Sequence, residues 1–105
     1  MRKNTIISRV HQWVEAVVQP GAVVIDATVG NGHDTLFLAQ CVAETGQVYG
    51  FDVQASALTK TRERLESEGM DAQVNLIEQG HEHMRDVLDS YTIESAQVIM
   101  FNLGY

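Results

Sequence analysis

The sequence predicts an α/β fold in which helices cover both faces of a mainly parallel sheet. Short apolar runs alternate with amphipathic helical patterns along the 105 residues. One run, 22–26, ends in a carboxylate, and a turn with two glycines and a helical pattern follow it. A second run, 47–52, also ends in an acid, about twenty residues after that turn. This order of strand, glycine turn, helix and strand is typical of the first unit of a nucleotide-binding sheet.

Helical and strand-like patterns alternate along the whole chain. Apolar spacing predicts helices over 5–18, 34–43, 54–67 and 81–89, and apolar runs predict strands over 22–26, 47–52, 74–77 and 98–101. Such alternation implies parallel pairing through right-handed crossovers. We therefore expect a three-layer sandwich with a strand order that begins 3-2-1-4. In the first helix, we expect Trp13 to be a core contact.

The composition indicates one small domain, residues 1–105, and excludes several classes of protein. Hydrophobic residues make up 45% of the chain, enough for a single core. The net charge of −7 repels phosphate backbones, so this segment alone is a poor platform for nucleic acid. The single cysteine, Cys41, forms no intrachain disulfide, and the scattered histidines do not have metal-ligand spacing. The apolar runs are too short for a membrane span. Because a chain with one cysteine fits an intracellular home best, we expect a cytoplasmic protein.

Polar residues follow the ends of the predicted strands. Asp26 and Asp52 close the first two strands, residues 79–81 follow the third, and Asn102 follows the fourth. The carboxyl ends of parallel strands meet at one edge of a sheet, where ligands bind near the point at which the strand order reverses. We therefore expect these side chains to converge on one ligand site.

The turn after the first strand discriminates between two kinds of ligand. A dinucleotide pyrophosphate favours a third glycine, but Thr35 occupies that position. Asp26 would repel a pyrophosphate and suits a cationic ligand such as S-adenosylmethionine. Gly30 and Gly32 let the backbone approach a ligand without a Cβ, and Asp52 is placed to accept hydrogen bonds from ribose hydroxyls. The residues therefore favour S-adenosylmethionine over NAD.

Residues 26–35, Asp-Ala-Thr-Val-Gly-Asn-Gly-His-Asp-Thr, resemble motif I of class I S-adenosylmethionine-dependent methyltransferases, with Thr28 in place of the first glycine. With Leu-Phe-Leu-Ala at 36–39, Tyr-Gly-Phe-Asp at 49–52, Gly-His-Glu at 80–82 and Phe-Asn-Leu-Gly-Tyr at 101–105, the chain is similar to the bacterial rRNA-methylase family. Members of that family are associated with tRNA (5-aminomethyl-2-thiouridine) methyltransferase activity. The resemblance implies a Rossmann-like fold and methyl transfer to an aminomethyl group on the wobble uridine of tRNA.

The resemblance and the strand-end positions together define the candidate site. Cofactor contacts are predicted for Asp26, Thr28, Gly30, Asn31, Gly32, Asp34, Thr35, Asp52, Gln54, Gly80 and His81. Asn102 is the predicted catalytic residue, which would orient the amine toward the sulfonium methyl; the alternative is a simple strand-end turn. Asn31, Asp34 and Thr35 could also start the helix as caps. His81 could instead be a cap or a surface residue.

Members of the family are nearly twice as long and have seven strands. The resemblance therefore implies that this chain is the N-terminal half of a methyltransferase domain that ends after strand four. Its bare strand edge predicts self-association or a homodimer, and we expect little tRNA methylation by the 105 residues alone. Two alternatives stay open, namely an NAD- or nucleotide-sugar-dependent oxidoreductase on the same fold and a non-catalytic cofactor-binding module.

Overall fold

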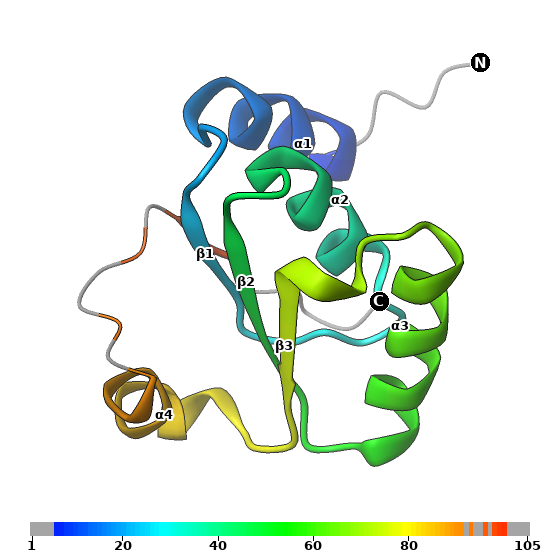
Figure 1. The fold of residues 1–105 in the computed structure, drawn as a ribbon, viewed down its shortest axis with the longest axis vertical. Helices are drawn as coiled ribbons and strands as arrows, with labels where there is room; N and C mark the ends of the chain where they lie inside the picture. Colours follow the sequence, from blue (N-terminus) through cyan, green and yellow to red (C-terminus); the bar gives the residue numbers. More distant parts are fainter. Residues whose placement is uncertain (1–5, 92, 94–95, 97, 101–105) are drawn as a thin grey trace.

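A four-stranded parallel sheet forms the centre of the molecule (Figure 1). The computed structural model describes residues 6–91, 93, 96 and 98–100, the side chains of residues 6–8 and 10 excepted. The strands are β1 (Val23–Asp26), β2 (Gln47–Phe51), β3 (Val74–Ile77) and β4 (Val98–Met100), in the order β3-β2-β1-β4. Every neighbouring pair among these described strands is parallel, which confirms the predicted fold class and strand order.

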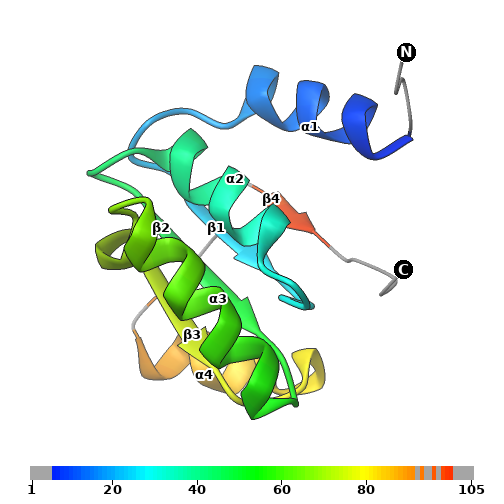
Figure 2. The ribbon, with the colours of Figure 1, turned by 90° about the vertical axis from the view of Figure 1, so that its right-hand side faces the viewer.

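Helices cover the two faces of the sheet unequally. On one face lie α1 (Ile6–Val17), α2 (His33–Val42) and α3 (Ala55–Ser67), and on the other lies α4 (Met84–Ser90) (Figure 2). Short 3-10 turns over Asp71–Gln73 and His81–His83 precede β3 and α4. The result is a three-layer sandwich of helices, sheet and helix, because the helices that connect parallel strands pack on the faces of the sheet.

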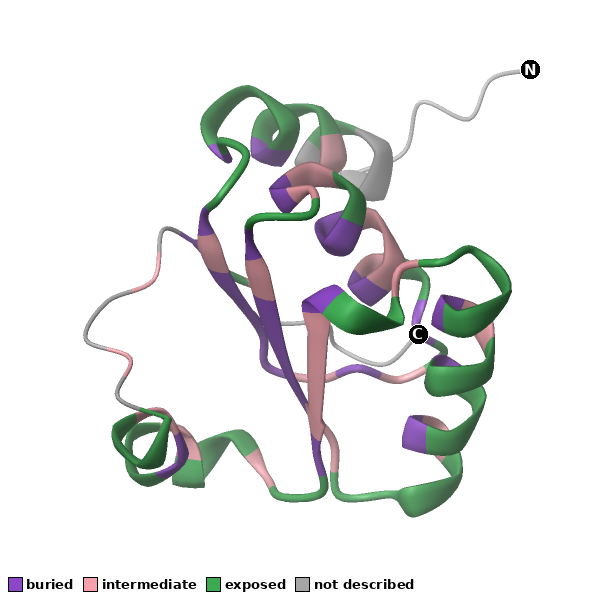
Figure 3. Ribbon diagram, in the orientation of Figure 1, coloured by how far each residue is buried: buried purple, intermediate pink, exposed green. Residues whose placement is uncertain are grey.

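Two apolar clusters, one on each face of the sheet, hold the layers together. Figure 3 shows buried residues along β1 and β2 and mostly exposed residues on α3. Successive residues of a strand point to opposite faces. Val24 and Val48 therefore lie in the cluster under α1, α2 and α3, whereas Ile25 and Tyr49 lie in the cluster under α4. The central strands β1 and β2 are buried along almost their whole length, as expected for strands that are covered on both faces.

The first helix differs from its prediction at Trp13. The helix lies where the apolar spacing places it, and Val14 is 1% exposed, but Trp13 is 60% exposed. Val14 and Val18 join the core cluster, so Trp13 lies outside it and its predicted core contact is wrong. Trp13 and Val14 are adjacent and both apolar, so helical periodicity does not decide which of them borders the buried stripe.

The remaining element boundaries agree closely with the sequence patterns. The predicted helix over 81–89 is divided into the 3-10 turn at His81–His83 and α4. The end of the predicted fourth strand and Asn102 lie outside the described residues. In the part of the chain that the structure describes, no helix combines the length and the apolar character needed to cross a membrane.

Candidate functional site

Two glycines in the left-handed backbone region shape the loop from β1 to α2. Gly30 has a φ of 57° and Gly32 a φ of 86°, a conformation that costs a residue with a Cβ about 1–2 kcal/mol. The Gly32 amide donates to the Val29 carbonyl at 3.0 Å, and the Leu36 amide donates to the Gly32 carbonyl at the same distance. The chain thus reverses sharply, and α2 begins beside the end of β1.

The two glycines have different surroundings. A Cβ on Gly32 would lie 2.5 Å from Oγ1 of Thr61, a buried residue of α3. Gly32 therefore allows the turn to pack against α3, and this packing accounts for the glycine without a ligand. A Cβ on Gly30 would meet no atom within 4 Å. Open space at Gly30 means that a ligand can approach its backbone closely.

Asp26 closes β1 in the interior of the protein. Its side chain is 0% exposed and accepts hydrogen bonds from Oγ1 of Thr35 at 2.7 Å and from the amide of Thr28 at 3.3 Å. Burial raises the pKa of Asp26 from 3.8 to about 7; the two hydrogen bonds oppose this rise, and the nearby charges of Asp34 and Asp52 add to it. Near neutral pH, much of Asp26 is therefore uncharged. The predicted role of Asp26 beside a cationic cofactor stays a prediction.

Thr35, which interrupts the dinucleotide glycine pattern, supports Asp26. The Thr35 side chain is 0% exposed and its hydroxyl donates to the buried carboxyl. It has no surface with which to contact a ligand, so the predicted direct contact is corrected to a positioning role. The N-cap position of α2 is occupied by Gly32 and not by Asn31, Asp34 or Thr35.

Asp52, at the end of β2, has a more open environment than Asp26. Its side chain is half-buried, Oδ2 accepts from the Gly30 amide and Oδ1 accepts from the Gln54 amide, both at 2.9 Å. The carboxylate therefore ties the glycine turn to the loop before α3. Each carboxylate oxygen has a further lone pair, so Asp52 keeps the capacity to accept hydrogen bonds from a ligand.

The glycine turn and the loop after β2 border an open hollow of about 410 Å³. Five of the predicted site residues line it, namely Thr28, Gly30, Asn31, Asp52 and Gln54. Four residues that the sequence interpretation missed complete the lining: Val53, Ser56, Ala57 and Lys60. The hollow lies at the carboxyl edge of the sheet, where such folds bind ligands, and its volume is typical of small-molecule sites, roughly 300–1,000 Å³.

The missed residues give only a faint signal in the sequence. Val53 follows Asp52 directly and is 67% exposed, whereas an apolar residue beside a strand is ordinarily expected to be buried. Lys60 belongs by sequence to the charged outer side of α3. Only the approach of α3 to the glycine turn brings Lys60 to the hollow, and that approach depends on Gly32 and Thr61.

Asp34, in the first turn of α2, is held by α1. Nε2 of His11 lies 2.7 Å from Oδ1 of Asp34, and the His11 ring stacks on Phe37 with 3.9 Å between the centroids. These contacts place the middle of α1 beside the start of α2. Asp34 does not line the hollow, and its predicted cofactor contact stays a prediction.

The remaining predicted residues lie farther along the same edge of the sheet. Gly80 is half-buried and His81 is exposed, on the loop that follows β3, and neither lines the hollow. Met100 of β4 pairs with Asp26 of β1, so Asn102 follows a strand that is in register with the site. Asn102 itself lies outside the described residues.

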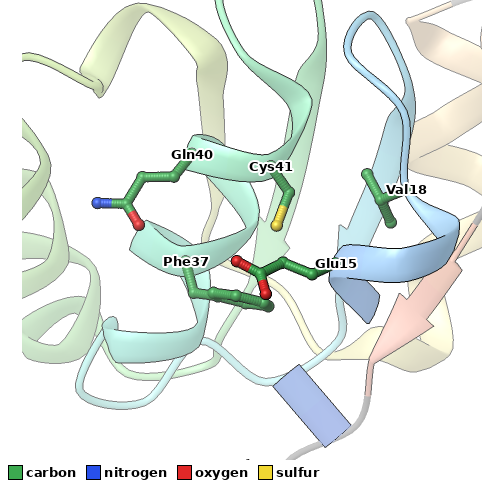
Figure 4. A pocket seen from close by; sticks show the side chains of 5 residues that line it. All are labelled: Glu15, Val18, Phe37, Gln40 and Cys41. Atoms are coloured by element: carbon green, nitrogen blue, oxygen red, sulfur yellow. The ribbon is translucent and has the colours of Figure 1, made fainter. Parts of the chain in front are cut away.

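A second hollow, of about 210 Å³, lies between α1 and α2 (Figure 4). Its lining consists of Glu15, Val18, Phe37, Gln40 and Cys41. Burial, together with the Glu15 charge, raises the pKa of the Cys41 thiol, so the sulfur stays protonated and poorly nucleophilic at neutral pH. Among the described residues, no group of three or more His, Cys, Asp and Glu side chains is placed to hold a metal ion.

Comparison with known sequences assigns the family. A profile of the family described as "Putative rRNA methylase" matches residues 48–105, which is more than half of the chain. This chain belongs to that family. The match begins within β2 and contains Asp52 and Asn102, whereas the glycine turn after β1 precedes it.

Two curated relatives act on different RNAs by name. The chloroplast tRNA (mnm(5)s(2)U34)-methyltransferase of Arabidopsis thaliana is 37% identical over 99% of the chain. Ribosomal RNA small subunit methyltransferase H of a Parafrankia strain is 34% identical over 94% of the chain. The chain spans only 39% and 30% of these two proteins.

Two solved structures have the same fold over the entire chain. The "putative rRNA-methylase" of Clostridium thermocellum is 38% identical with a TM-score of 0.88, and a "putative methyltransferase" of Streptococcus mutans is 41% identical with a TM-score of 0.80. The chain covers 54% and 55% of these two proteins. The Streptococcus mutans protein was solved in complex with S-adenosylhomocysteine (SAH).

Proposed function

We propose that the protein is an S-adenosylmethionine-dependent RNA methyltransferase and that residues 1–105 form its cofactor-binding half. The observation that carries this proposal is the SAH-bound Streptococcus mutans structure, which is 41% identical over the whole chain. The chain also offers a hollow at the expected edge of the sheet, with a half-buried carboxylate and a Cβ-free turn beside it. These features fit a ribose and a close backbone approach.

The position of each predicted residue then suggests its role in binding the cofactor or in holding the turn. When bound, S-adenosylmethionine supplies an electrophilic methyl group on a sulfonium. Asp52 would accept the ribose hydroxyls, and the Gly30 backbone would border the ligand. Thr28, Asn31 and Gln54 line the same hollow, and Gly80 and His81 follow the next strand along the edge. Asp26 and Thr35 would hold the turn in place from the interior.

We propose an amine acceptor, the aminomethyl group on the wobble uridine of tRNA. The supporting observation is the Arabidopsis relative, whose named activity concerns that nucleoside and whose match covers 99% of the chain. The nitrogen lone pair of an uncharged amine would attack the methyl carbon in line as the carbon–sulfur bond breaks, and the product would lose a proton to solvent. Asn102 is the proposed catalytic residue that orients this amine, and the cytoplasm is the proposed compartment.

Calorimetric titration with SAH and with NAD, followed by methylation of tRNA that carries 5-aminomethyluridine, tests this function. We expect SAH to bind and NAD not to bind. Tighter binding of NAD would instead indicate an oxidoreductase, and SAH binding without turnover by the intact protein would indicate a non-catalytic module. Asn102→Ala should lower the single-turnover rate roughly ten- to a thousandfold and change SAH affinity by less than about threefold.

A further inference from the structure

One side of α1 is exposed and carries no acidic side chain. Its residues are spaced so that they share one side of the helix: Arg9, Gln12, Trp13, Ala16 and Val17. We name these five residues the α1 outer face. Trp13 is 60% exposed and Val17 is 41% exposed, whereas Val14, on the opposite side, is buried in the core. An exposed Trp beside an exposed Arg is an uncommon use of a large apolar side chain on a surface.

The charges of the chain are distributed unevenly along the sequence. Residues 1–14 contain three of the seven Lys and Arg residues and none of the fourteen Asp and Glu residues. From Glu15 onward, four cations face fourteen acids. The first fourteen residues are therefore cationic by composition on a strongly acidic chain, and Arg9 is the cation among them that the structure describes.

The His11 side of α1 packs against the first turn of α2, and the α1 outer face lies on the opposite side of the helix. His11 bonds to Asp34 at 2.7 Å and stacks on Phe37, which fixes the middle of α1 beside the first turn of α2. Figure 2 shows the first turns of α1 on the side of the molecule toward which the β4 arrow points. Arg9 precedes His11 by two positions and therefore belongs to these first turns of α1.

We propose that the α1 outer face binds the RNA substrate, with the Trp13 indole stacked on an unpaired base and the Arg9 guanidinium on a neighbouring phosphate. This inference rests on the proposed function, which requires an acidic protein to hold a polyanion close to its cofactor. Base stacking on exposed aromatic side chains, flanked by cations, is the usual means of binding unpaired bases in RNA. Arg9, the one cation of the α1 outer face, favours RNA over an apolar partner.

The single tryptophan makes the contact directly observable. Trp13 is the only Trp among the 105 residues, and the fluorescence difference between the wild-type protein and a Trp13→Phe variant reports on this face alone. We expect iodide to quench Trp13 in the free intact protein, and we expect titration with a tRNA transcript to quench it saturably and to protect it from iodide. Shielding of Trp13 before RNA is added would mean that a second copy or another part of the protein covers the face, and would overturn the proposal.

Substitutions with a matched control test how much the α1 outer face contributes to tRNA affinity. Trp13→Ala and Arg9→Glu should each weaken tRNA binding about tenfold or more, as expected for loss of one stacked base or one phosphate contact. Arg62→Glu is the control. Arg62 is an exposed cation on α3, so this substitution makes the same charge reversal away from α1. It should change tRNA affinity by less than about twofold. The slope of log affinity against log salt should fall by about one for Arg9→Glu.

SAH affinity, measured on every variant, separates the two proposals. Unchanged SAH affinity with weakened tRNA binding in the α1 variants alone supports the outer face. Equal weakening by Arg62→Glu, or unchanged Trp13 fluorescence when tRNA is fully bound, overturns the outer face and leaves the proposed function intact. Absence of SAH binding by the wild-type protein would overturn the proposed function itself.

Discussion

Asp26 and Asp52 end neighbouring strands of one sheet, yet the structure gives them opposite environments. Asp26 is completely buried and bonded to the Thr35 hydroxyl, and burial raises its pKa to about 7. Asp52 is half-buried beside an open hollow, and its oxygens accept from the backbone amides of Gly30 and Gln54. Asp26 is the last residue of β1 and pairs with Gly50, whereas Asp52 follows β2, so the same residue type serves the interior in one case and a ligand surface in the other.

The two glycines of the turn repeat this division. Gly32 packs against Thr61 of α3, whereas Gly30 borders open space. One side of the turn, with Asp26, Thr35 and Gly32, faces the protein interior, and the other side, with Asp52 and Gly30, faces the hollow. Substitutions on the interior side should change stability, and those on the hollow side should change binding of the proposed cofactor.

The largest expected effect is the pH dependence that Asp26 imposes on stability. Its folded pKa, about 7, lies above the ordinary value of 3.8, so the folded state binds this proton more tightly than the unfolded state. The stabilisation is complete below about pH 4 and is lost as pH rises through 7, by about 4 kcal/mol in all. Asp26→Asn should remove this loss, and should therefore be more stable than wild type at pH 8.

Urea unfolding of wild type and Asp26→Asn at several pH values between 5 and 8 measures this difference directly. The four histidines titrate in the same range in both proteins, so only the difference between the two curves is diagnostic. A difference that does not change with pH would show that Asp26 is ionised throughout and would remove the proposed contrast with Asp52.

Alanine at the two glycines should separate stability from binding. Gly32→Ala combines a left-handed backbone with a contact 2.5 Å from Thr61 Oγ1, and should lower the free energy of unfolding by about 3 kcal/mol. Gly30→Ala has only the backbone cost, about 1–2 kcal/mol, but places a methyl group at the hollow. Denaturation and SAH titration of both variants check this, and a larger stability loss for Gly30→Ala would contradict it.

The smallest expected effect in free energy concerns Asp52 and the proposed cofactor. Asp52→Ala removes an acceptor of ribose hydroxyls and should weaken SAH binding about tenfold or more, which corresponds to about 1.4 kcal/mol. The variant also frees the Gly30 and Gln54 amides, so a small stability loss should accompany it. Asp26→Asn is the matched control and should change SAH affinity by less than about threefold. Equal losses of SAH affinity in the two variants would contradict the assignment of Asp52, and not Asp26, to the ligand surface.

Local patterns were sufficient to predict the architecture. Alternating apolar runs and helical spacing identified the elements, and the handedness of crossovers led to the order β3-β2-β1-β4. The glycine turn and the acids at the ends of β1 and β2 were visible for the same reason, because strand ends and turns depend on residues close together in the chain. These strand ends and turns meet at one edge of the sheet, and five of the predicted residues line the hollow there.

The sequence by itself therefore determined the fold class, the strand order and the edge at which the candidate residues meet. The tertiary structure alone decided that Asp26 is buried and Asp52 is not, that Gly32 faces Thr61, and that Trp13 lies outside the core. The physical reason is that burial depends on partners far away in the chain. α3 approaches the turn through Thr61, and α1 is placed against α2 by the bond from His11 to Asp34, which no local pattern specifies.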